Sequence, residues 1–208
     1  MLDRNGFDNW AGNYDETINK SSEGYPFEGY YDVLGYVQNS IETSEEIWIL
    51  DLGIGTGSLT NELYKNGVNI VGVDFSKKMI EEANKKMPKG TFICYDFNEN
   101  LPSEITNRKF DYIISSYAIH HVDDERKLEL INHLSNTLKN NGKIIIADIA
   151  FENMEHLELV KTETGQWDED EYYIVADKFI SRLDDLGFYA SYRQISKCGG
   201  VLEIRRKI

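Results

Sequence analysis

The chain has 208 residues, of which 41% are hydrophobic, and its 36 Asp and Glu against 22 Lys and Arg give a formal net charge of −14. This length suits one domain, residues 1–208, with a proper core, and leaves no room for a separate substrate domain. A negative field repels phosphate backbones and anionic lipids, so we expect no nucleic-acid partner and no membrane partner.

The cysteine content points to a reducing compartment. Only Cys94 and Cys198 occur, and their spacing is not that of metal ligands, so we predict neither a disulfide framework nor a metal site. The first ten residues lack the apolar core of a secretory signal, and no run approaches the roughly 20 apolar residues that cross a bilayer. We therefore expect a cytoplasmic protein, either a monomer or a homodimer.

The beginning of the chain is rich in aromatic residues and only weakly helical. Gly24, Pro26 and Gly29 interrupt it, which favours short helices separated by turns. We predict that residues 1–41 form one or two short helices that pack on the sheet edge and cap the ligand cleft, while residues 42–208 form the α/β core.

Residues 47–76 carry the most informative pattern of the sequence. A short apolar run, 47–51, ends in Asp51, and a loop with three alternate glycines, Gly53, Gly55 and Gly57, leads into a helix over 58–66. A second apolar run, 69–74, ends in Asp74. This order predicts a strand, a tight loop, a helix and a second strand, the unit of nucleotide-binding α/β sheets.

The spacing and charge of this loop narrow the ligand. Glycines let a ligand lie against bare main chain, and Asp74 at the end of the second strand is placed to accept hydrogen bonds from ribose hydroxyls. The dinucleotide fingerprint needs a third glycine where this chain has Ser58. Asp51 favours an ammonium over a pyrophosphate, and S-adenosylmethionine combines a ribose with an amino-acid tail. A sharp turn without a ligand is the alternative reading.

Strands and helices continue to alternate after Asp74. Ser76 reads as the cap of a helix that Pro88 stops, and further strands are predicted over 91–95, 110–115 and 143–149. Asp123 is predicted to cap a helix that closes at Gly142, with these residues on one face: Leu128, Ile131, Leu134 and Leu138. Five alternations predict a doubly wound, Rossmann-like parallel sheet.

The remainder of the chain starts with an acidic stretch, 152–171, which we interpret as a surface insertion with a helix over 153–164. A helix over 172–186 and two strands, 188–196 and 200–207, are predicted to follow. The last two strands are joined through a tight loop, which predicts a terminal hairpin.

These motifs resemble those of the class I S-adenosylmethionine-dependent methyltransferases. The first family motif is an acid followed by glycines, here Asp51 to Gly57, and the second is the acid after the next strand, here Asp74. The resemblance covers nearly the whole chain and implies a seven-stranded, mostly parallel sheet with an antiparallel last strand. It also implies S-adenosylmethionine as cofactor and in-line transfer of its methyl group.

The resemblance also implies the adenine site. In the family, the residues after the second and third strands read the adenine, here Phe75, Asp96 and Phe97. Asp96 is placed to accept from the adenine amine, and the two phenyl rings offer apolar faces. A strand-end cap is the structural alternative for Asp96.

The segment 115–121, SSYAIHH, stands at the fourth family motif. It lacks the prolines of nucleobase amine methyltransferases, and Ser115 stands where the metal-dependent catechol type has an acid. The resemblance implies that this segment, Ser115 included, lines the methyl-transfer site, and the two departures favour a small-molecule substrate. The segment resembles the ubiquinone and menaquinone biosynthesis branch, and within it uncharacterised bacterial methyltransferases that share FDxWAxxYD and YAxHH.

Four side chains are candidates for the chemistry itself. Trp10 and Tyr14 belong to the FDxWAxxYD match, and an aromatic ring attracts a sulfonium, although both residues could equally pack the first helix on the sheet. His121 is the candidate general base, since a histidine titrates near neutral pH, and His120 is a weaker one. The structural alternative is that one of the two caps or braces the following helix.

Two further functions stay open at this point. A non-catalytic module that binds or senses S-adenosylmethionine is compatible with the lack of an unambiguous base. A nucleotide-sugar or NAD enzyme is the third reading, and Ser58 argues against it.

Overall fold

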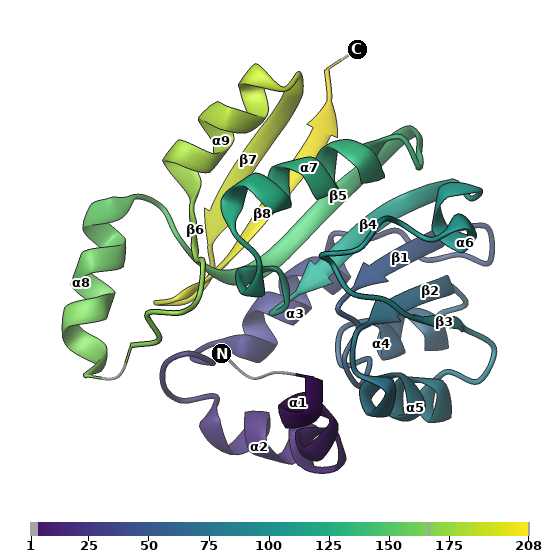
Figure 1. The fold of residues 1–208 in the computed structure, drawn as a ribbon, viewed down its shortest axis with the longest axis horizontal. Coiled ribbons are helices and arrows are strands. Elements are labelled where there is room, and N and C mark those ends of the chain that lie inside the picture. Colours follow the sequence, from purple (N-terminus) through teal and green to yellow (C-terminus); the bar gives the residue numbers. More distant parts are fainter. Residues whose placement is uncertain (1–3, 166, 208) are drawn as a thin grey trace.

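A computed structural model describes residues 4–165 and 167–207 of the chain. Its centre is a mixed sheet with strand order β3-β2-β1-β4-β5-β8-β7, to which β6 adds beside β5 (Figure 1). The strands are β1 (Trp48–Leu52), β2 (Asn69–Asp74), β3 (Thr91–Cys94), β4 (Phe110–Ser116), β5 (Leu138–Phe151), β6 (Ile174–Val175), β7 (Phe188–Gln194) and β8 (Gly199–Arg206).

The direction of the strands follows the expectation. Strands β1 to β5 pair in parallel, and β8 is antiparallel to both β5 and β7. The predicted Rossmann-like doubly wound sheet with an antiparallel last strand is therefore confirmed. It has eight strands within the described residues where the sequence predicted seven, because β6 adds beside β5. Strand order reverses between β1 and β4, and in such sheets ligands bind outside the carboxyl ends of the strands at this point.

Helices cover both faces of the sheet. One face packs against α3 (Tyr30–Asn39), α4 (Thr60–Lys65) and α5 (Lys77–Lys86), and the other against α6 (Ser103–Thr106), α7 (Asp124–Ser135) and α9 (Ala176–Asp185). Ile145 of β5 faces the first layer and Ile146 the second, because successive side chains of a strand alternate. Both residues are buried, as expected of a central parallel strand.

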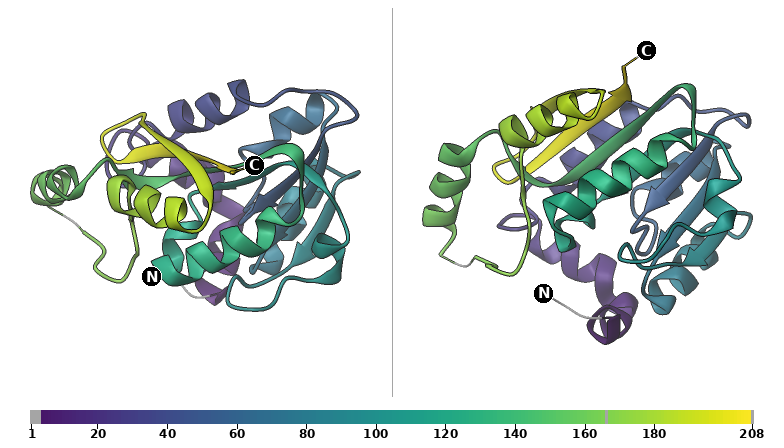
Figure 2. Two further views of the ribbon diagram at one scale, coloured as in Figure 1. Left: turned by 90° about the horizontal axis from the view of Figure 1, so that it is seen from above. Right: turned by 45° about the horizontal axis from the view of Figure 1, so that its top comes forward.

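Three elements lie outside these two layers. The helices α1 (Arg4–Trp10) and α2 (Tyr14–Ser21) lie together below the sheet in Figure 1, near α5, and α8 (Met154–Thr164) stands at the side beyond β6. The turned views of Figure 2 show the same separation of α8 from the sheet. The N-terminal region thus holds three α-helices, where the sequence predicted one or two.

Helix starts agree with the capping residues read from the sequence. The Ser76 hydroxyl accepts from the Met79 amide at 3.2 Å, and the Asp123 carboxylate accepts from the Arg126 amide at 2.8 Å. Gly67 follows the C-terminal end of α4 and has a φ of 92°, a left-handed conformation that suits glycine. These local signals were sufficient because each satisfies backbone groups within one turn.

The helix predicted to run from Asp123 to Gly142 is shorter than expected. It ends at Ser135, and Leu138 begins β5 opposite Phe110. The Phe110 amide donates to the Thr137 carbonyl at 2.8 Å. Pairing with β4 therefore satisfies this backbone, and the helical spacing of Leu138 was misleading.

The helix predicted from Tyr172 starts later, at Ala176. Ile174 and Val175 instead form β6, which pairs with Ala150 and Phe151 of β5. Two consecutive β-branched residues suit a strand when a neighbouring strand offers a free edge. None of the helices in the described ranges is long and apolar enough to cross a membrane.

Candidate functional site

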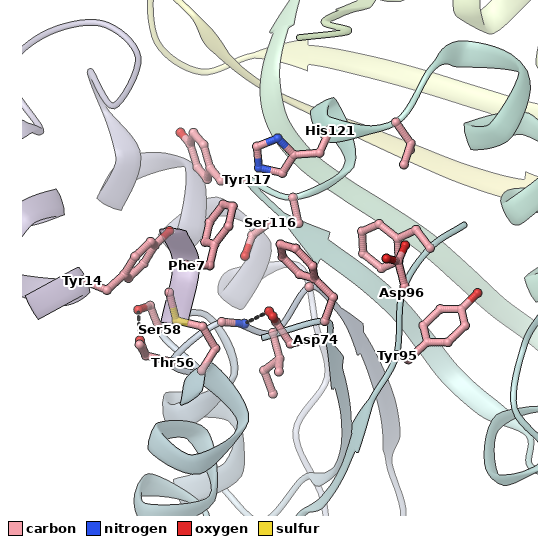
Figure 3. A pocket seen from close by; sticks show the side chains of 18 of the residues that line it. Phe7, Tyr14, Thr56, Ser58, Asp74, Tyr95, Asp96, Ser116, Tyr117 and His121 are labelled. Carbon is pink, nitrogen blue, oxygen red and sulfur yellow. Dashed lines mark hydrogen bonds between the residues drawn. The ribbon is translucent and has the colours of Figure 1, made fainter. Parts of the chain in front are cut away.

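A pocket opens at the carboxyl ends of β1 to β4, where the strand order reverses (Figure 3). Eight of the residues predicted for the site line it: Tyr14, Gly53, Gly55, Asp74, Phe75, Asp96, Phe97 and His121. They come from α2 and from the ends of four strands, so the fold brings together segments that are distant in sequence.

Four predicted residues do not line this pocket. The Ser115 hydroxyl donates to the Leu52 carbonyl at 2.9 Å within the sheet, and the neighbouring Ser116 faces the pocket instead. A Cβ on Gly57 would meet the Met87 methyl at 2.5 Å, so Gly57 serves packing between the loop and α5. Trp10 packs edge-on against Tyr14, and Asp51 lies beneath the loop.

The glycine loop presents bare backbone to the pocket. Gly53 and Gly55 have φ angles of 70° and 54°, which side chains rarely adopt. A Cβ on Gly53 would stand 2.3 Å from the Ala118 Cβ, whereas a Cβ on Gly55 would meet nothing within 4 Å. The space in front of Gly55 is therefore open to a ligand.

Asp74 fixes this loop from the end of β2. Its Oδ2 accepts from the Gly55 amide at 2.9 Å and its Oδ1 from the Ser76 amide at 2.8 Å, as the dashed line in Figure 3 shows for Gly55. Burial raises the pKa of Asp74 to about 6, although the two amides oppose the rise. Each oxygen keeps a further lone pair for a ligand hydroxyl.

Asp51 is a buried carboxylate, 1% exposed, whose polar neighbour is the equally buried Thr60 hydroxyl. Neither group makes a hydrogen bond of ordinary geometry among the described residues, yet Thr60 is close enough to oppose the rise of the Asp51 pKa. Burial raises the pKa of Asp51 to about 7, and the negative charge of Asp74 adds to the rise. A buried unpaired charge is costly, so this site favours a positive group nearby.

The far end of the pocket is formed by the loop after β3. The Asp96 Oδ1 accepts from the Asn98 amide at 2.9 Å, so the turn expected as an alternative role is present. Asp96 also lines the pocket, and its Oδ2 accepts no hydrogen bond from the described residues. Arg126 of α7 donates to the carbonyls of Phe97 and Glu99, both at 2.7 Å, and holds this loop in place.

Aromatic residues of the first helices form the near wall. The Phe7 ring packs edge-on against Phe75 at 5.2 Å and against His121 at 5.5 Å between ring centres. Phe7 therefore spans the pocket, as Figure 3 shows. Burial raises the pKa of Tyr14 well above its usual value, so its hydroxyl keeps its proton.

The third side of the pocket follows β4. Tyr117 has a φ of 48°, an uncommon conformation for a residue other than glycine, and its buried hydroxyl has no described partner. Its ring lies 4.7 Å from that of Tyr30. Strained residues concentrate at functional sites, and Tyr117 lines this pocket.

His121 lines the pocket beside Tyr117. Burial lowers the pKa of His121 to about 3, and the neighbouring His120 lowers it further. The ring is therefore neutral at physiological pH. Efficient general bases have a pKa near the working pH, so the structure weakens the case for His121 as a base and leaves its lone pair available for binding.

Sequence reasoning missed several residues of this site. Phe7, Tyr30, Ser116, Tyr117 and Arg126 either line the pocket or hold its loops. Phe7 belongs to the same N-terminal motif as Tyr14, which was a usable signal. The roles of Tyr30 and Arg126 depend on tertiary contacts, which no local pattern indicates.

Several known proteins are similar to this chain over most of its length. A methyltransferase-domain family profile matches residues 49–142. An uncharacterised methyltransferase of Anoxybacillus flavithermus is 37% identical over 162 residues, which cover 77% of this chain and 73% of that protein. One of Bacillus pumilus is 31% identical and covers 97% of this chain and 96% of the relative. The chain belongs to this methyltransferase family.

A solved structure supports the fold of this methyltransferase. The complex of DhpI with SAH superposes with a TM-score of 0.73 at 17% sequence identity, covering 98% of this chain and 95% of DhpI. At this identity the likeness concerns the fold.

Proposed function

We propose that this methyltransferase transfers a methyl group from S-adenosylmethionine to a small-molecule acceptor. The observation that carries the proposal is the open space before Gly55, flanked by the Asp74 carboxylate and with the buried Asp51 carboxylate at the end of β1. DhpI and a magnesium protoporphyrin IX methyltransferase of Synechocystis have been crystallised with SAM or SAH, which supports the choice of donor.

The residues present fit the parts of this donor. The second lone pairs of Asp74 would accept from ribose hydroxyls, and Asp51 would attract the ammonium from beneath the loop. Phe75 and Phe97 would enclose the adenine, with Asp96 accepting from its amine. Tyr14, backed by Trp10, would face the sulfonium, which an aromatic ring attracts by about 0.5 to 2 kcal/mol.

The chemistry asks mainly for positioning. The sulfonium, when bound, supplies an already activated methyl group. The chain then has to align an acceptor with that methyl and exclude water, and alignment can supply roughly 7 to 11 kcal/mol. Phe7, Tyr117 and His121 would form the walls that do so, because they converge on one side of the pocket.

The enclosed, largely aromatic walls favour a small acceptor over a macromolecule. The net charge of −14 supports the same choice. The match to the ubiquinone and menaquinone branch remains part of this proposal. A non-catalytic binding module is the less favoured alternative, since the relatives are named as methyltransferases.

Calorimetry with S-adenosylmethionine and its demethylated product tests the donor. We expect binding with a stoichiometry of one, and Asp74→Ala should weaken it by about 1 to 3 kcal/mol through unpaired ribose hydroxyls. Asp32→Ala, on the outer side of α3, is the control. Absence of binding at millimolar donor would contradict the proposal.

The acceptor class needs its own experiment. Cell extract fractions below and above a small size cutoff are incubated with the protein and labelled donor. We expect label in the small-molecule fraction. Label found only in protein or RNA would overturn the small-molecule assignment and leave the donor assignment intact.

A further inference from the structure

Three potential metal ligands lie together, and one of them, His121, lines the pocket. His120 and His121 occupy the turn after β4, and Glu171 lies just before β6. One ligand atom from each of the three lies within 4.8 Å of the other two. The Tyr172 amide donates to the His120 carbonyl at 2.9 Å, so the backbone itself joins the two segments.

Asp148 of β5 orients the first ligand. Its Oδ2 accepts from the amides of Ile119 and His120, and its Oδ1 accepts from the His120 Nδ1. With Nδ1 bonded to this carboxylate, the His120 Nε2 is turned towards Glu171 at 3.6 Å. A carboxylate behind a histidine is the usual support of a metal-binding imidazole.

His121 provides the second ligand atom. Its Nδ1 is buried, has no hydrogen-bond partner in the described ranges, and lies 3.7 Å from the Glu171 Oε1. Both imidazole distances to Glu171 exceed the 2.7 to 3.2 Å of ordinary hydrogen bonds. They are close to the spacing of about 3.4 Å between ligands in a tetrahedral site with bonds near 2.1 Å.

The charges around these atoms also favour a cation. Asp148 and Glu171 bring two carboxylates to a region where both histidine side chains are largely buried. The nearby Lys127 ammonium is committed to the Asp124 carboxylate and the Tyr172 carbonyl. The Tyr173 hydroxyl near Glu171 carries no charge, so it does not offset the negative charge of the two carboxylates.

We propose that His120, His121 and Glu171 bind one divalent transition-metal ion, with Asp148 as the positioning residue behind His120. Two imidazoles and one carboxylate suit Zn²⁺, Fe²⁺ or Co²⁺ better than Mg²⁺ or Ca²⁺. Three protein ligands leave a coordination position open. Since His121 lines the pocket, that position would hold an oxygen, nitrogen or sulfur of the acceptor.

This site was not predicted from the sequence, from which we expected no metal and considered the two histidines as bases or as braces of the following helix. The sequence does not indicate the cluster, because Glu171 is far from the histidine pair along the chain and is one of many acids in the stretch before β6. Metal binding is independent of the proposed methyl donor. Its failure would leave the methyltransferase proposal standing, and the converse also holds.

Two titrations of the chelator-treated protein, both without donor or acceptor, test the proposal. In the first, Co²⁺ is added and its visible absorption is recorded; in the second, Zn²⁺ binding is measured by calorimetry. We expect one ion per chain. His121→Ala and Glu171→Gln should weaken binding about 100-fold or abolish it, and Asp148→Asn should weaken it about 10 to 100-fold.

His133→Ala is the matched control, because His133 lies exposed on α7 outside the cluster. It should bind like the wild type, and circular dichroism checks the fold of each variant. Absence of a stoichiometric Co²⁺ band, or a band of equal strength in folded His121→Ala and Glu171→Gln, would overturn the proposal.

Discussion

The Asp15 carboxylate accepts a hydrogen bond from the Thr56 hydroxyl at 2.5 Å, which ties α2 to the glycine loop. The same carboxylate pairs with Lys86 at the end of α5. Nearby, the Ser76 hydroxyl donates to Asp8 at 2.6 Å. The first two helices are therefore fastened to the loops that would hold the donor, and they carry Phe7 and Tyr14 into its pocket.

Loss of the Asp15 contacts should loosen this cover. We expect Asp15→Ala to weaken S-adenosylmethionine binding by about tenfold, because hydrogen bonds to a charged group contribute about 1.5 to 3 kcal/mol before solvent screening. Calorimetry measures the effect. Glu16→Ala, whose exposed partner is Lys20, is the control. Equal affinities of the two variants would show that the cover does not help to hold the donor.

The open space at Gly55 can be tested with a matched glycine. Gly55→Ala and Gly187→Ala both place a methyl at positive φ where nothing lies within 4 Å, so each should cost about 1 kcal/mol of folding stability. Only Gly55 borders the pocket. We expect at least a tenfold loss of donor affinity for Gly55→Ala and none for Gly187→Ala, by chemical unfolding and calorimetry.

Asp51 predicts a pH dependence of donor binding. With a pKa raised to about 7, its carboxyl is largely protonated at pH 6 and ionised at pH 8. Because the ammonium favours the ionised form, affinity should rise by up to about tenfold over this range. Calorimetry at pH 6, 7 and 8 checks it, and Asp51→Asn should flatten the profile. An unchanged profile in Asp51→Asn would contradict this role.

For the ligand-free protein we expect Asp51 to give the opposite pH dependence, now of the free energy of unfolding. The folded pKa of Asp51 lies above its usual 3.8, so the folded state holds the proton more tightly. Its contribution to the free energy of unfolding is complete below about pH 4 and is lost as pH rises through 7. Urea unfolding at pH 5 and pH 8 should show a smaller decrease for Asp51→Asn than for the wild type.

Arg126 is predicted to act on the adenine loop through two carbonyls. Arg126→Ala should free the loop after β3 and weaken donor binding by about tenfold, since each charged hydrogen bond contributes about 1.5 to 3 kcal/mol. Arg182→Ala removes an exposed ion pair with Glu125 and is the control. Unchanged affinity in Arg126→Ala would show that the loop is held by its other contacts.

Local signals were sufficient for most of the fold. The Ser76 and Asp123 caps and the left-handed Gly67 are determined within a few residues, and the structure confirms them. Leu138 and Ile174 were assigned to helices, yet both lie in strands. Their backbones pair with β4 and β5, and such pairing depends on partners far along the chain.

The candidate site was predictable where it follows the ends of strands. Asp74 and Asp96 stand at such ends, so strand order alone brings them to one edge. Ser115 was expected to line the site and does not, because successive side chains of a strand point to opposite faces. The next residue, Ser116, lines the pocket instead. Glu171 could not be found, because it reaches the histidines through the register of β6 on β5.

The segment matched by the family profile, 49–142, contains the glycine loop, Asp74 and the histidine pair. Phe7 and Tyr14 precede it, and Glu171 follows it. Residues proposed to line the pocket or to bind a metal therefore lie on both sides of the matched segment as well as within it. Exchanging the two flanks between relatives would measure how far they contribute to the choice of the molecule that receives the methyl group.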